Sequence, residues 1–185
     1  MKRLRNFSTL FLILMLAFIV TGCQYNVITE EQKEILITYD DFKFFDVDDY
    51  EMAGCETYLS KTNIDNSVEL EYSFDSSKNE LNDSVLYFDS EIEINISQKN
   101  ADVAFDDRIK SYEIGARIGK SKLEEIDNLP KYYDNFYVAI KKQEDRIIGN
   151  VIVIQSGKKI ISLLIDGAYI SDPYLIMEFL DTVML

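Results

Sequence analysis

Residues 146–166 read RIIGNVIVIQSGKKIISLLID and carry the most regular apolar pattern in the chain. Two apolar runs, 147–154 and 159–166, flank Ser156-Gly157, a pair typical of a tight turn. Because both runs are apolar at consecutive positions, they are expected to be strands covered on both faces. The pattern therefore predicts a buried antiparallel hairpin.

Further strands are expected upstream of this hairpin. Residues 136–141 precede it across a polar turn at 143–145, so a three-strand antiparallel meander is predicted. Residues 68–75 and 86–96 alternate apolar with polar side chains, as strands with one wet face do. Glutamates on that face would repel each other across two paired strands unless Lys or Arg from a neighbouring element approaches them.

Helices are expected beside these strands. Thr29 begins a capping-box pattern with Gln32, and Asp172-Pro173 has the composition of a helix start. After Asn100, a plausible N-cap, apolar side chains recur at helical spacing at four positions: Phe105, Ile109, Tyr112 and Ala116. A sheet with some wet and some dry strands needs helices on each side. We therefore expect an α+β fold over 29–185, a single globular domain in which an antiparallel sheet lies inside a three-layer α/β/α sandwich.

The order of these elements is similar to the PsbP-like fold of photosystem extrinsic proteins and some nuclear-import factors. The resemblance covers about residues 35–185. It depends on the strand pair around Glu69 and Glu93, the helix expected over 102–118, and the final hairpin followed by Asp172-Pro173. It implies the α/β/α sandwich, and a fold by itself implies no function.

The first 22 residues have the layout of a secretory leader. A basic start at 2–5 is followed by an apolar run at 10–20 and then by Val20-Thr21-Gly22-Cys23. This motif resembles the lipobox of bacterial lipoproteins, which implies that 1–22 is a signal peptide, that Cys23 receives lipid and that 23–28 is a lipidated tether. The alternative, a transmembrane anchor, is disfavoured because the 14 residues from 7 to 20, which are interrupted by Ser8 and Thr9, reach about 21 Å across a core of about 30 Å.

Lipidation of Cys23 implies a location in the bacterial cell envelope, with the domain tied to a membrane. Two or more acyl chains hold a protein stably, whereas one holds it only marginally. Gln24 stands where an aspartate would signal retention at the inner membrane. In a host with two membranes, the expected place is therefore the periplasmic side of the outer membrane.

Composition limits the partners. The chain has 19 basic and 33 acidic residues, and the leader holds three of the basic ones and none of the acidic ones. So strong an acidic excess repels nucleic acid and anionic lipid headgroups. Since 47% of the chain is hydrophobic, a packed core is expected. Once Cys23 is lipidated, Cys55 remains as a lone cysteine, which is a small buried hydrophobe, a partner in an intermolecular disulfide or a reactive thiol.

The chain contains no histidine. That excludes Ser-His-Asp and Cys-His nucleophile systems and His-ligated zinc. No intact catalytic motif takes their place, so we expect no enzyme activity and no cofactor.

Two clusters are candidate binding sites. Four acids within a short run are a candidate calcium site, although a run of this kind is also typical of a solvated surface: Asp46, Asp48, Asp49 and Glu51. Four aromatic residues form either an exposed platform for a ligand or the packed end of a core: Tyr132, Tyr133, Phe136 and Tyr137.

These features favour a membrane-anchored envelope lipoprotein with a non-catalytic interaction domain. Its expected contacts are the membrane, through the lipid on Cys23, and a protein partner or a small apolar ligand. The first alternative is a carrier of lipid or another small apolar ligand. The second is a carboxylate- or calcium-dependent hydrolase.

Overall fold

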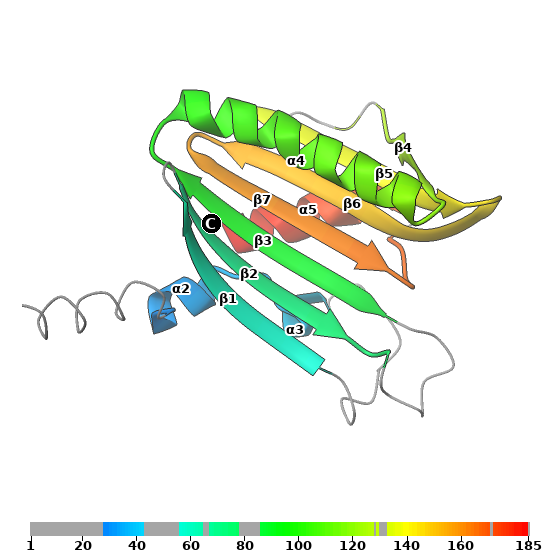
Figure 1. Ribbon diagram of the computed structural model, residues 1–185, viewed down its shortest axis with the longest axis horizontal. Coiled ribbons are helices and arrows are strands. Elements are labelled where there is room, and N and C mark those ends of the chain that lie inside the picture. Colours follow the sequence, from blue (N-terminus) through cyan, green and yellow to red (C-terminus); the bar gives the residue numbers. More distant parts are fainter. Residues whose placement is uncertain are drawn as a thin grey trace, which may run out of the picture.

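The computed structural model describes residues 28–42, 56–64, 67–77, 86–127, 129, 133–170 and 172–184. Within these ranges, seven strands form one antiparallel sheet in the order β1-β2-β3-β7-β6-β5-β4 (Figure 1). The strands are β1 (Glu56–Ile64), β2 (Ser67–Asp75), β3 (Tyr87–Asn95), β4 (Lys122–Glu125), β5 (Asn135–Gln143), β6 (Arg146–Ser156) and β7 (Lys159–Asp166). The helices are α2 (Glu30–Glu34), α3 (Tyr39–Phe42), α4 (Gln98–Ile118) and α5 (Pro173–Met184).

The predicted hairpins are confirmed. β5, β6 and β7 pair in sequence order as an antiparallel meander, and β2 pairs with β3. Seven consecutive residues of β6, from Gly149 to Gln155, are buried, as expected for a strand covered on both faces. β7 also pairs with β3, and this contact joins the two hairpin groups into one sheet.

α4 packs on one face of the sheet, over β4–β7 (Figure 1). Its stripe residue Phe105 is buried in a cluster with Val151 of β6 and Ile160 of β7. Gln155, also fully buried, donates from Nε2 to Asp102 Oδ1 at 2.7 Å. This bond joins the first turns of α4 to the end of β6.

The larger core cluster lies on the opposite face. Leu36 and Ile37, after α2, and Ile176 of α5 are buried there. Asn150 of β6 is also fully buried on this side, where its Oδ1 accepts from the backbone N of Ile170 at 2.6 Å. This hydrogen bond ties the segment between β7 and α5 to the sheet.

The predicted three-layer α/β/α sandwich is wrong. Among residues described with their side chains, strands account for 49% and helices for 28%, so the sheet dominates the fold. α4 covers β4–β7 and also contacts β3. On the opposite face, α2 and α3 have 5 and 4 residues and α5 has 12. The sandwich was expected because β2 and β3 each have one wet face, but the carboxylates of that face pair with a single arginine of α4, Arg108.

The predicted helix starts differ in accuracy. The Thr29 capping box is confirmed: Thr29 Oγ1 accepts from the backbone N of Gln32, and Gln32 Oε1 accepts from the backbone N of Thr29, both at 3.2 Å. α4 begins earlier than expected. Its N-cap is Ser97, whose side chain accepts from the backbone N of Asn100, so Asn100 lies in the first turn.

Candidate functional site

The sheet face on which α4 packs is apolar over β5–β7 and acidic over β2 and β3. On β2 and β3, alternation puts six carboxylates on this face: Asp75 at the end of β2, and five others that are here called the acidic face, Glu69, Glu71, Asp89, Glu91 and Glu93. The register sets Glu69 opposite Glu93 and Glu71 opposite Glu91. Directly opposed like charges destabilise a strand pair, so the acidic face needs a cation.

Arg108 of α4 is that cation. Its Nη1 donates to Glu91 Oε2, and its Nη2 lies 3.3 Å from both Glu69 Oε1 and Glu93 Oε2. The relief of cross-strand repulsion by a basic side chain from a neighbouring element is therefore confirmed. Three formal negative charges surround one positive charge, so the group keeps an excess of negative charge.

The position of Arg108 follows from helix geometry. It is three residues after Phe105 and four before Tyr112, so it lies on the same face of α4 as the apolar stripe. This spacing is the sequence signal that could have identified Arg108 as a partner of the sheet. Its side chain is 20% exposed and that of Glu91 is 8% exposed, so their ion pair is largely shielded from water.

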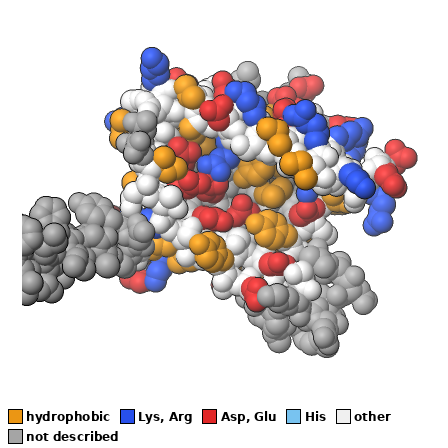
Figure 2. Space-filling model, in the orientation of Figure 1, with side chains coloured by type: hydrophobic (Ala, Val, Ile, Leu, Met, Phe, Trp, Pro, Cys, Tyr) orange, Lys and Arg blue, Asp and Glu red, His pale blue; other side chains and the backbone are white. Residues whose placement is uncertain are grey.

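The acidic face is visible beside α4. Figure 2 shows Asp and Glu side chains gathered below α4, over the strands that Figure 1 labels β1–β3. Ser60 of β1 donates to Glu71 Oε2 at 3.1 Å. Among the described residues, Arg108 is the one basic side chain that forms an ion pair with this face.

Asp89 occupies an unfavourable place on the acidic face. Its Oδ1 is buried and has no hydrogen-bond partner among the described residues. Burial raises the pKa of Asp89 to about 6, and the Glu71 carboxylate adds to the rise, whereas the Arg108 guanidinium opposes it. Tyr87 and Tyr112 lie close to Asp89, and burial is the main reason that the pKa of each is raised to about 12.

We expect Asp89→Asn to stabilise the protein at pH 7.5. The folded-state pKa of about 6 lies above the value of about 3.9 in the unfolded chain. Stability from this group is therefore fully present below about pH 4 and is lost as the pH rises through 6. After allowance for solvent screening, removing the charge should raise the free energy of unfolding by about 1 kcal/mol at pH 7.5.

Urea unfolding of wild type and variant at pH 4 and pH 7.5 measures this effect. The gain should shrink markedly at pH 4, where Asp89 of the folded wild type is already protonated. Asp106→Asn, at an exposed position on α4, is the control and should change stability little at either pH. An equal gain at both pH values would show that protonation of Asp89 is not the cause.

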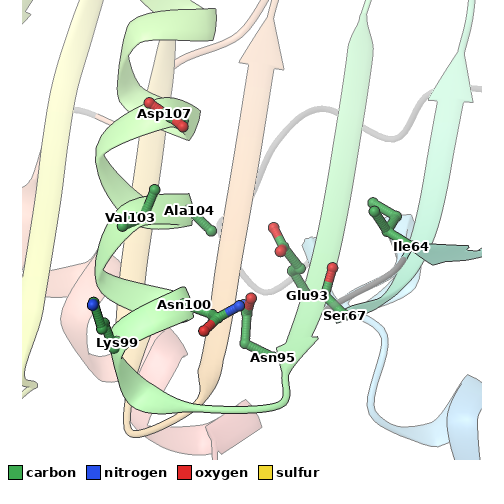
Figure 3. Close-up of a pocket in the computed structure, with 9 residues that line it drawn as sticks. All are labelled: Ile64, Ser67, Glu93, Asn95, Lys99, Asn100, Val103, Ala104 and Asp107. Atoms are coloured by element: carbon green, nitrogen blue, oxygen red, sulfur yellow. The ribbon is translucent and has the colours of Figure 1, made fainter.

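A pocket of about 350 Å³ lies at one end of the acidic face, where β3 turns into α4 (Figure 3). Ser67 and Glu93 line its sheet side, and Asp107 lines its helix side. Asn95 also lines the pocket; it is 5% exposed, and its Nδ2 has no hydrogen-bond partner among the described residues. A buried amide donor without a partner costs free energy, so the pocket is a candidate site for a ligand that would accept from this amide.

The aromatic candidates are not brought together as one platform. Tyr133 donates from its hydroxyl to Asp181 Oδ1 at 2.8 Å. Phe136 packs against the larger core cluster, whereas Tyr137 is buried in the smaller cluster under α4, on the opposite face of the sheet. Tyr132 lies outside the described residues.

The other predicted site residues also lie outside the described part of the chain. They are Cys23 with its leader, Cys55, and the calcium candidates Asp46, Asp48, Asp49 and Glu51. Within the described ranges, no group of three or more acidic or cysteine side chains is arranged to hold a metal ion. Nor is any helix of those ranges long and apolar enough to cross a membrane.

Comparisons with known proteins add no relative. No protein-family model, curated protein or solved structure matches the chain. The functional argument therefore depends on the acidic face and its pocket.

Proposed function

We propose that this chain is a lipid-anchored envelope lipoprotein whose acidic face binds a positively charged segment of a partner protein. The observation that carries this proposal is the ratio of charges on that face. Five carboxylates line neighbouring strands, and Arg108 is the one basic side chain that forms an ion pair with them in the described part of the chain. A basic segment would supply the missing positive charge.

Electrostatic complementarity of this kind mainly sets specificity and association rate. The register sets two pairs of these carboxylates directly opposite each other, so a Lys- or Arg-rich segment would meet the summed field of several carboxylates. Nucleic acid and anionic headgroups would be repelled by the same field. An apolar tail would leave these carboxylates desolvated without a partner, which supports a basic protein segment over a lipid cargo.

The anchor in this proposal is Cys23. In the Cys23→Ser variant, the host should accumulate uncleaved precursor that incorporates no labelled fatty acid, because the acceptor thiol is gone. Gel mobility and metabolic labelling with a radioactive fatty acid measure both effects. Wild-type chain expressed in the same cells is the control, and continued labelling of the variant would contradict the lipobox assignment.

The charge proposal predicts a specific loss of binding when the acidic face is neutralised. The test variant carries Glu69→Gln, Glu71→Gln and Glu93→Gln and keeps Glu91, the closest partner of Arg108. Its affinity for a heptalysine peptide should fall at least ten-fold at 50 mM salt. Calorimetric titration of the full chain in detergent micelles measures the dissociation constants.

The matched control removes the same charge elsewhere. Glu30, Glu31 and Glu34 lie on the surface of α2, and changing all three to Gln alters the net charge equally. This variant should bind heptalysine within about two-fold of wild type, apart from the long-range field that salt screens. Equal losses in both variants would mean that the peptide responds only to net charge, and the acidic face would lose its assigned role.

A further inference from the structure

The pocket at the end of the acidic face has different polar groups at its two ends. In Figure 3, Asn95, Lys99 and Asn100 lie near the turn from β3 into α4, whereas Glu93 and Asp107 lie farther along the strand and helix. The first group holds hydrogen-bond donors, and the second holds only carboxylates. The pocket therefore offers donors at one end and acceptors at the other.

Asn95 is the residue that most directly indicates a bound ligand. Its backbone N donates to Lys158 O at 2.9 Å, and its Cα is paired with Ser67 across the β2–β3 ladder, so its main chain is held from both sides. Its side chain is aimed into the pocket beside that of Asn100 (Figure 3). With 5% exposure and an unpartnered Nδ2, it has a donor ready for a carbonyl or carboxylate oxygen.

The rim of the pocket is apolar. Ile64 at the end of β1 and Val103 on α4 both line it, and they are 51% and 57% exposed. Basic side chains lay their methylene stems along apolar surface while the charged head reaches a polar partner. Such a stem could lie between these two side chains with its head at Glu93 and Asp107.

We propose that this pocket seats a single arginine or lysine residue of an extended peptide. The peptide carbonyl accepts from Asn95 Nδ2 at the donor end. The cationic head lies against Glu93 and Asp107 at the acceptor end, where it replaces the exposed Lys110 as the partner of Asp107. The inference rests on the proposed function, because it names the place on the acidic face where one basic residue of the partner is held.

The test uses the full chain, labelled with nitrogen-15 in detergent micelles, and follows its side-chain amide signals by NMR. The probe is N-acetyl-arginine N-methylamide. It should shift the Asn95 amide signals in a saturable way. The citrulline analogue has the same shape without the charge, and n-butylguanidine has the charge without the peptide carbonyl; each should bind at least ten-fold more weakly.

Two variants separate binding from folding. Asn95→Leu removes the donor and should weaken the arginine probe at least ten-fold, while its melting temperature equals or exceeds that of wild type because an unpartnered buried amide is gone. Asp107→Asn removes an exposed ion pair with Lys110, which contributes little to stability, and should weaken the probe with little change in melting temperature. Unaltered binding by Asn95→Leu, or equal binding of the citrulline analogue, would overturn the inference.

These results also distinguish this inference from the broader proposal. If heptalysine binding depends on the acidic face but the arginine probe leaves the Asn95 signals unmoved, the face keeps its role and the pocket assignment fails. If the probe shifts the Asn95 signals but heptalysine binds the triple Gln variant as tightly as wild type, the pocket assignment stands and the extended interaction fails.

Discussion

Gly149→Ala is expected to lower the free energy of unfolding by about 3 kcal/mol or more, at the upper end of overpacking effects. Gly149 is buried in β6, where a Cβ atom would lie 1.9 Å from the carbonyl oxygen of Ile165 on β7 and 3.0 Å from its carbonyl carbon. The obstacle is backbone, which cannot turn aside as a flexible side chain can. Relief requires the β6–β7 pairing to open at the middle of the sheet.

Urea unfolding followed by far-ultraviolet circular dichroism measures this loss. Gly115→Ala is the matched control, because Gly115 lies inside α4 and a Cβ atom there would meet nothing within 4 Å. That variant should gain up to about 1 kcal/mol, since alanine is the better helix former. Comparable stability of the two variants would show that β6 and β7 tolerate a side chain at Gly149.

Arg108→Met should also destabilise the protein strongly, by about 3 kcal/mol at pH 7.5. The change keeps the apolar stem of the side chain but removes the charge shared by Glu69, Glu91 and Glu93. Left alone, these carboxylates would repel each other for as long as they are ionised. The loss should therefore be greatest at neutral pH and shrink as the pH falls towards 4.

A companion variant tests the cause. Adding Glu91→Gln to Arg108→Met removes the most buried of the three charges and should recover part of the lost stability. Arg117→Met, on an exposed part of α4, is the control and should change the free energy of unfolding by less than about 0.5 kcal/mol. If Arg108→Met is as stable as wild type, the three glutamates do not depend on that cation.

Local patterns in the chain were sufficient to predict the strands with strong alternation or continuous apolar runs. They located β2, β3, β5, β6 and β7, the stripe of α4 and the Thr29 capping box. β1 was missed because its residues are mostly exposed on both faces, so it has no period-two signal. β4 was missed because it has four residues, three of them charged.

The candidate site was only partly predictable. Alternation in β2 and β3 set the glutamates on one face, and the need for a basic neighbour followed from their repulsion. The identity of that neighbour did not follow, because Arg108 is distant in sequence from Glu69 and reaches it only through the packing of α4. Nor could the sequence indicate that Asn95 would be buried without a partner for its amide.

Periodicity determines which side of a strand or helix is apolar, since that depends only on residues a few positions apart. It does not determine which element covers that side. The pairing of β3 with β7 joins strands about seventy residues apart and sets the width of the sheet. α4 then packs its apolar stripe on the apolar side chains of β4–β7, while its Arg108 pairs with the carboxylates of the acidic face on β2 and β3. The sandwich was mispredicted for this reason: the amount of sheet that each helix covers is decided by tertiary packing.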